Sequence, residues 1–133
     1  MSAACSTPVM ANRPQWAGVF PAISTQFHAD GTINFAANQR MLEQLIADGI
    51  DGIIALGTIG ENASLNAAEK QEFLRHTVQT VAGRIPVIAG CTEHSATDAI
   101  TYVQAAEQIG VSGIMLLPAV VANVMKADGH YVA

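Results

Sequence analysis

The chain has 133 residues, enough for one ordinary domain or for a piece of a larger one. Apolar residues make up 50% of it and charged residues 13%, with six Lys and Arg and a net charge of −5. So few basic residues exclude the clustered basic face that binds nucleic-acid phosphates. The apolar share is high for a stand-alone domain of this size, whose large surface needs polar cover. We therefore expect the chain to bury surface against further protein.

The ends and the cysteines give little sign of export. The first residues lack the basic start and the apolar core of a signal peptide, and no apolar run approaches the ~18–20 residues of a membrane span. Cys5 lies in a predicted tail and Cys91 in a predicted loop. We therefore expect no disulfide framework, no membrane partner and a reducing, cytoplasmic location.

Apolar runs and stretches of helical spacing alternate along the chain, and the apolar runs do not alternate with polar residues, which is typical of strands buried on both faces. The expected elements in chain order are a strand at Gly18–Ile23, a turn at Asp30-Gly31, a helix over 34–48, a strand at Gly52–Leu56, a helix over 66–83, a strand at Pro86–Gly90, a helix over 95–110 and a strand at Gly113–Leu117. This β-α-β-α-β-α-β order predicts a parallel sheet with right-handed crossovers.

Polar residues at the predicted helix starts support these boundaries. Asn34 is a plausible N-cap, Asn66 with Glu69 resembles a capping box, and Ser95 with Asp98 fits a third capped start. Each of these residues can accept a hydrogen bond from an otherwise unpaired backbone amide. Local chemistry thus predicts where all three helices begin.

Two segments share one frame, Gly-Ile/Val-x-Gly-Ile-x-x-Leu. They are "ADGIDGIIALG" (Ala47–Gly57) and "QIGVSGIMLLP" (Gln108–Pro118). Each reads as a helix C-cap glycine, a tight turn and a buried strand. Such a repeat fits either a (β/α)₈ barrel or a doubly wound sheet.

The same stretches carry a resemblance to a known family. "GVFPAISTQF", "GIDGIIALGTIGENASLNAAEK", "RIPVIAG" and "GVSGIMLLP" stand in the order and spacing of the dihydrodipicolinate synthase / N-acetylneuraminate lyase family. The resemblance runs from about Gly18 to about Val121 and is most specific at Gly57–Glu61. It implies an α/β fold, the N-terminal half of a (β/α)₈ TIM barrel, with tails at 1–16 and 122–133 around four βα units at 17–121.

The family resemblance gives the glycine-bracketed turn after the second strand a function. Active sites of such barrels lie at the C-terminal ends of the strands, where this turn stands. The resemblance implies that Thr58 passes protons as a catalytic residue, and that the backbone at Ile59 and Gly60 binds the carboxylate of pyruvate or another 2-oxo acid. A glycine-bracketed turn can present several N–H donors to an anion. No cofactor and no metal are implied, and a homo-oligomer is expected of the full-length form.

Three departures from the family pattern limit the activity expected here. Ile59 stands where dihydrodipicolinate-forming members usually carry a second threonine, and Pro118–Val121 lacks the usual tyrosine pair. Family members also form a Schiff base through a lysine after the sixth strand, whereas the lysines here are Lys70 and Lys126. We therefore expect a class I aldolase or lyase chain truncated before its catalytic lysine and inactive alone. The alternative is a non-catalytic product, or a half-barrel that associates with another chain.

Several residues also have simpler interpretations. Thr58 could merely satisfy loop backbone groups, Ile59 could pack, and Glu61 fits a structural carboxylate at a helix start. The stretch Cys91–His94 lacks the converging ligands of a zinc site. In the predicted helices, His76 is interpreted as a surface partner of Glu72 at i,i+4 spacing. Tyr102 is interpreted as a helix-packing residue.

Overall fold

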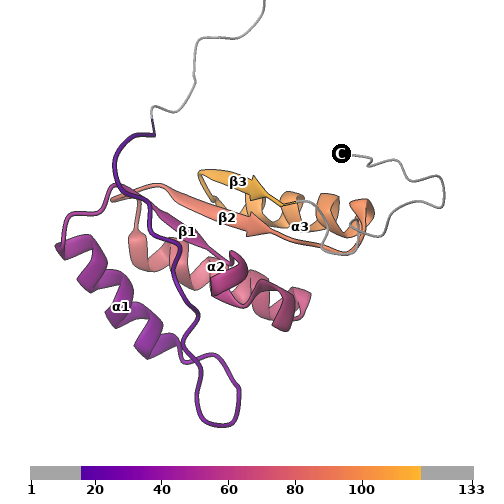
Figure 1. Ribbon diagram of the computed structural model, residues 1–133, viewed down its shortest axis with the longest axis horizontal. Coiled ribbons are helices and arrows are strands. Elements are labelled where there is room, and N and C mark those ends of the chain that lie inside the picture. Colours follow the sequence, from indigo (N-terminus) through magenta and orange to yellow (C-terminus); the bar gives the residue numbers. More distant parts are fainter. Residues whose placement is uncertain (1–15, 118–133) are drawn as a thin grey trace, which may run out of the picture.

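The computed structural model describes residues 16–117. Its elements, in chain order, are α1 (Phe35–Ala47), β1 (Ile53–Ala55), the 3₁₀ turns η1 (Thr58–Gly60) and η2 (Asn62–Ser64), α2 (Ala67–Val81), β2 (Val87–Cys91), α3 (Ala96–Ile109) and β3 (Gly113–Leu116). Helices and strands alternate as the sequence predicts (Figure 1). The predicted tails, apart from Trp16, fall outside the described residues.

The three strands form one parallel sheet in the order β1-β2-β3. Ile54 stands opposite Ile88, which stands opposite Gly113. α2 connects the first pair of strands and α3 the second. Sequential order is that of a barrel wall, since a doubly wound sheet reverses direction partway. The predicted barrel segment is confirmed.

The predicted first strand, Gly18–Ile23, lies beside β1 but is not a regular strand. Its single bridge pairs Ala22 with Ile54 in parallel. The Ile23 N–H donates to the Ile54 carbonyl at 3.0 Å, and the Ile54 N–H donates to the Pro21 carbonyl at 2.9 Å. Pro21 has no N–H of its own, so the ladder cannot continue through it. The segment nevertheless extends the sequential order by one position.

All three predicted helix caps are present. The Asn34 side chain accepts the Ala37 N–H, and the Ser95 side chain accepts the Asp98 N–H. Asn66 and Glu69 form a reciprocal capping box. These bonds satisfy amides that have no partner inside the helix. The helices therefore begin where their sequences specify.

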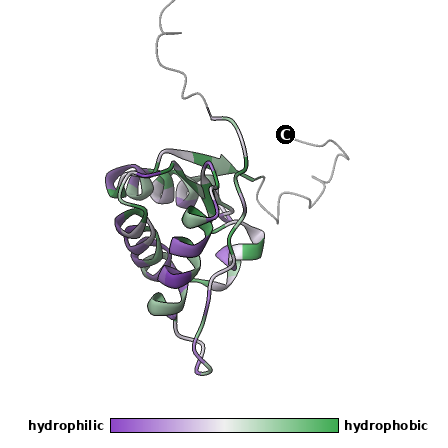
Figure 2. Cartoon of the chain, turned by 90° about the vertical axis from the view of Figure 1, so that its left-hand side faces the viewer, coloured by the Kyte–Doolittle hydropathy of each residue, from purple (hydrophilic) through white to green (hydrophobic). Residues whose placement is uncertain are grey.

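One face of the sheet packs against the helices and forms the core. Alternate strand residues, Ile53 and Ala55 in β1 and Val87 and Ala89 in β2, join the helix residues in one buried cluster. Figure 2 shows hydrophilic residues along the helices and hydrophobic ones along the strands. The core is completed by Leu42, Phe73, Leu74, Val81, Tyr102 and Ala106.

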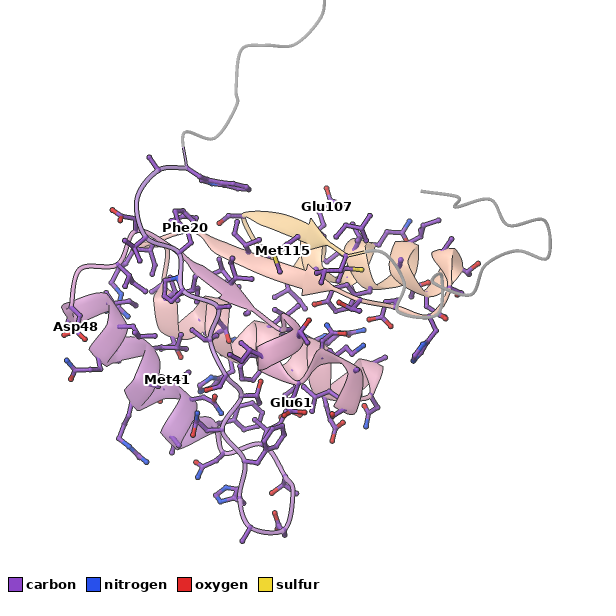
Figure 3. The ribbon with its side chains drawn as sticks, viewed as in Figure 1. Phe20, Met41, Asp48, Glu61, Glu107 and Met115 are labelled. Carbon is purple, nitrogen blue, oxygen red and sulfur yellow. The ribbon has the colours of Figure 1, made fainter. Side chains whose placement is uncertain are left out.

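The other face of the sheet is an apolar surface that two aromatic side chains partly cover. A Cβ on Gly113 would overlap the Trp16 ring, and one on Gly52 would overlap the Phe20 ring, so both glycines admit an aromatic ring against a strand start. A cavity of about 340 Å³ remains here, lined in part by Ile54, Ile88 and Met115. Figure 3 shows Phe20 and Met115 near the strands, away from Met41 of α1.

The outer edge of β3 pairs with no other strand in the part of the chain that the structure describes. Leu116, on this strand, is 67% exposed. An unpaired edge presents free backbone groups that favour association.

None of the described helices is long and apolar enough to cross a membrane.

Candidate active site

The predicted site turn lies beyond the C-terminal end of β1. Leu56, which is fully buried, takes a left-handed backbone conformation with φ 55°. Glu61, which is exposed, also has a left-handed backbone, with φ 62°. These two residues redirect the chain on either side of η1. Figure 3 shows Glu61 at the end of the sheet opposite Asp48, the cap at the C-terminal end of α1. The turn therefore stands where barrel enzymes place their active sites.

β2 makes room for this turn. Gly90 lies so close to the turn that a Cβ on it would overlap the carbonyl of Leu56. Only glycine permits that approach between a strand and a neighbouring backbone. A residue of β2 thus fixes how near the turn can lie to the sheet.

Backbone hydrogen bonds inside the turn divide its amides into two groups. The Gly60 N–H donates to the Gly57 carbonyl at 2.9 Å, and the Glu61 N–H donates to the Thr58 carbonyl at 3.2 Å. Within the described residues, the amides of Thr58 and Ile59 donate to no protein acceptor. These two amides, rather than that of Gly60, are the donors that an anion could use.

The predicted site residues are gathered in this one turn but differ in exposure. Thr58 is exposed, Ile59 is 63% exposed, and Gly60 is buried. A Cβ on Gly60 would stand 3.1 Å from the Ile23 carbonyl oxygen, closer than an ordinary contact. Gly60 therefore lets the turn approach the first segment, while Thr58 and Ile59 present their side chains outward.

Two buried side chains hold the turn from either side, and the sequence analysis did not identify them. Thr25 donates its hydroxyl to the Gly60 carbonyl at 2.6 Å, and Asn62 donates its amide to the Gly90 carbonyl at 3.1 Å. Thr25 is 7% exposed and Asn62 is 1% exposed. The glycine–glutamate motif gave no signal of Thr25, which stands 35 residues before Gly60.

A second polar cluster surrounds Lys70, which enters from α2 and is 5% exposed. Its amino group contacts the Glu93 carboxylate at 2.6 Å and lies 5.8 Å from the centroid of the Tyr102 ring. Burial raises the pKa of the Tyr102 hydroxyl. A cavity of about 220 Å³ adjoins this cluster, and its lining includes Thr92 and His94. Lys70 is therefore ion-paired with Glu93, and Tyr102 packs in the core as predicted.

The Cys91–His94 stretch belongs to no cluster of potential metal ligands in the part of the chain that the structure describes. Cys91 is buried in β2, where burial raises the pKa of its thiol. Among residues 16–117, no three His, Cys, Asp or Glu side chains converge in a way that could hold a metal ion.

The contacts of His76 differ from those predicted from the sequence. The predicted surface pair with Glu72 is absent from the ion pairs of the described chain. The His76 ring instead packs against Phe35 of α1, with ring centroids 5.0 Å apart. Burial there lowers the pKa of the imidazole. The i,i+4 spacing was correct, but the contact between α1 and α2 determines where the ring lies.

Sequential parallel strands with outer helices and a strand-end turn are the architecture of a segment of a (β/α)₈ barrel. A profile of the dihydrodipicolinate synthetase family matches residues 15–127. The chain is 39% identical over 100 residues to the 4-hydroxy-tetrahydrodipicolinate synthase of Methanococcus maripaludis, covering 75% of this chain and 34% of that one. It belongs to the dihydrodipicolinate synthetase family of lyases and aldolases.

Solved structures show the same relationship. A dihydrodipicolinate synthase from Bacillus anthracis superimposes with a TM-score of 0.75 at 32% identity, covering 84% of this chain and 38% of that one. A prophage protein of the family from Escherichia coli K12, solved in complex with pyruvate, gives 0.75 at 30% identity, covering 88% and 43%. The chain spans about a third of the length of the curated relatives it matches.

Proposed function

We propose that the turn at Gly57–Glu61 binds the carboxylate of pyruvate or a related 2-oxo acid. The observation that carries this proposal is the pair of amides at Thr58 and Ile59, at the C-terminal end of a barrel strand, which donate to no acceptor among residues 16–117. Adjacent N–H donors of this kind form an anion site. A family structure contains pyruvate, which supports a ligand of that size and charge.

Within this proposal, Thr58 and Ile59 have different roles. The Thr58 hydroxyl is exposed beside the two amides and can donate and accept a proton, as a relay group must. Ile59 offers its amide but has no hydroxyl for the carboxylate. This exposed apolar side chain in place of a hydroxyl supports a 2-oxo acid reaction other than dihydrodipicolinate formation.

Schiff-base formation, the covalent step of class I aldolases, needs a free lysine amine, and the one lysine among the described residues is engaged in an ion pair. A Schiff base forms when a neutral lysine amine attacks the keto carbon and water leaves. Lys70 is buried against Glu93, and Lys126 lies outside the described residues. We propose that the chain corresponds to the part of a class I aldolase or lyase that precedes the nucleophile. It then binds the substrate carboxylate without completing the reaction.

A second candidate is a half-barrel that associates with another chain and has no catalytic role of its own. The exposed edge of β3 and its 67% exposed Leu116 favour it. In this case the turn would bind no 2-oxo acid, whereas the surface around β3 would be covered by the partner.

Borohydride trapping tests the proposed division of labour. The 133-residue chain is incubated with pyruvate and borohydride, and a full-length family member is treated in parallel. We expect the full-length protein to gain one reduced pyruvate adduct and this chain to gain none, because its one described lysine is engaged with Glu93. A stoichiometric adduct on Lys70 or Lys126 would show that the chain carries its own nucleophile.

A further inference from the structure

We propose that Thr25 is a positioning residue for the carboxylate-binding turn, acting through the carbonyl of Gly60. This inference rests on the proposed function of the turn. The Thr25 hydroxyl donates to that carbonyl at 2.6 Å, across 35 residues of sequence. The hydroxyl thus links the first segment to the turn that follows β1.

The hydrogen bond fixes the orientation of one peptide group. The Gly60 carbonyl and the Glu61 N–H belong to the same planar unit and point in opposite directions. With the carbonyl held by Thr25, the N–H is directed to the Thr58 carbonyl, which it meets at 3.2 Å. Thr25 therefore helps to close η1 from outside the turn.

This arrangement determines the charge that the turn presents. The carbonyls of Gly57, Thr58 and Gly60 all accept hydrogen bonds within the described residues, whereas the amides of Thr58 and Ile59 donate none. Apart from the Ile59 carbonyl, which accepts no hydrogen bond within the described residues, a carboxylate approaching the turn therefore meets donors rather than unpaired carbonyl oxygens. Without the Thr25 hydroxyl, the Gly60 carbonyl loses its partner, and the peptide can rotate so that an oxygen faces the anion.

A second anchor keeps the rest of the turn in place. Asn62, 1% exposed, donates to the Gly90 carbonyl on β2 at 3.1 Å. Because this contact holds the chain to β2 only two residues after Gly60, removal of the Thr25 hydroxyl should disturb η1 locally and leave the sheet intact. The effect of Thr25 can therefore be measured in a folded chain.

The test compares Thr25→Val, which keeps the shape and removes the hydroxyl, with Thr25→Ser, which keeps the hydroxyl. Thr77→Val is the matched control, since Thr77 is also buried but its hydroxyl has no hydrogen-bond partner in the described residues. Two quantities are measured by NMR in each variant. One is the hydrogen-exchange rate of the Gly60 and Glu61 amides, and the other is the affinity for pyruvate at the Thr58 and Ile59 amides.

We expect Thr25→Val to speed the exchange and to weaken pyruvate binding, each by about 10-fold, the upper end of what one hydrogen bond contributes. Thr25→Ser should restore both values, and Thr77→Val should change neither. Unchanged exchange and affinity in Thr25→Val, or equal changes in Thr77→Val, would overturn the proposal. If Thr25→Val does not fold, Thr25→Ala is measured by the same criteria.

The two readouts separate this inference from the proposed function. If the unmodified chain shows no pyruvate binding at the turn, the proposed function fails. The exchange rates then still decide whether Thr25 holds the turn: accelerated exchange in Thr25→Val supports the positioning role, and unchanged exchange overturns it.

Discussion

Two ion pairs show how burial decides the energetic value of a contact between individual residues. Lys70 and Glu93 meet with side chains only 6% and 14% exposed, whereas Arg84 and Glu43 meet with side chains 41% and 46% exposed. Removing one partner of a buried pair leaves an uncompensated charge in a dry site, but an exposed charge regains its water.

We therefore expect Lys70→Met to lower the free energy of unfolding by about 3 kcal/mol, as the loss of one partner of a buried pair typically does. Glu43→Gln is the matched control and should have little measurable effect, because water replaces the exposed partner. Urea unfolding of both variants provides the measurement. Equal losses in the two variants would contradict the claim that the buried Lys70–Glu93 pair contributes more to stability than the exposed Arg84–Glu43 pair.

His76 links stability to pH. Burial holds its pKa in the folded chain below the ordinary 6.5, so the unfolded chain takes up a proton first as the pH falls. The stability that His76 contributes is complete above pH 6.5 and is lost as the pH falls towards the folded pKa. Asp30 and Glu43, whose pKa values lie below their ordinary range, stay ionised across this interval.

The free energy of unfolding should accordingly fall between pH 7.5 and pH 5.5, and the fall should be smaller in His76→Phe. Phenylalanine keeps an aromatic ring against Phe35 but cannot take up a proton. Urea titrations at the two pH values measure the difference. The same pH dependence in both chains would show that the protonation of His76 does not contribute.

Residue-level prediction succeeded where the signal was local. The positions of Thr58, Ile59 and Gly60 in a strand-end turn followed from the flanking glycines and the buried run before them. Thr25, Asn62 and the Lys70–Glu93 pair could not be predicted in the same way, because their partners lie 35, 28 and 23 residues away. Side chains that hold a site from a distance become visible only in the fold.

At the scale of elements, capping chemistry placed the helices and proline limited a strand. The Asn66–Glu69 box satisfies amides at both ends of the first turn of α2, and this reciprocal pattern was legible in the sequence. The first apolar run, Gly18–Ile23, was also predicted as a strand. Pro21 within it lacks a backbone N–H donor, and the run forms a single bridge to β1. Apolar character predicted the position of that segment and not its regularity.

Asn66→Ala should lower the free energy of unfolding by about 1 kcal/mol, the usual value of an N-cap. Asn66→Asp retains an oxygen acceptor for the Ala68 and Glu69 amides and should keep most of the stability. Chemical denaturation followed by circular dichroism measures both. A loss in Asn66→Asp as large as in Asn66→Ala would argue against the capping interpretation.

For the molecule as a whole, the glycine frame repeated in the sequence explains both the course of the chain and the placing of aromatic rings. Gly49 and Gly110 end α1 and α3 with φ values of 85° and 97°, and Gly52 and Gly113 admit Phe20 and Trp16 against the strands. Barrel geometry followed from the resemblance and was confirmed by sequential strand order. The repeated glycine frame, by contrast, does not predict which segment or chain pairs with the outer edge of β3.

The proposed function requires that the amides of Thr58 and Ile59, which have no acceptor among the described residues, bind a 2-oxo acid through its carboxylate. The most direct measurement is an NMR titration of the ¹⁵N-labelled chain with pyruvate, with acetone as a control that has a ketone but no carboxylate. We predict saturable shifts that are largest at the amides of Thr58 and Ile59, none of comparable size at Gly83 and Gly110, and no response to acetone. Shifts absent from Thr58 and Ile59, or equally large at Gly83 and Gly110, would contradict the claim.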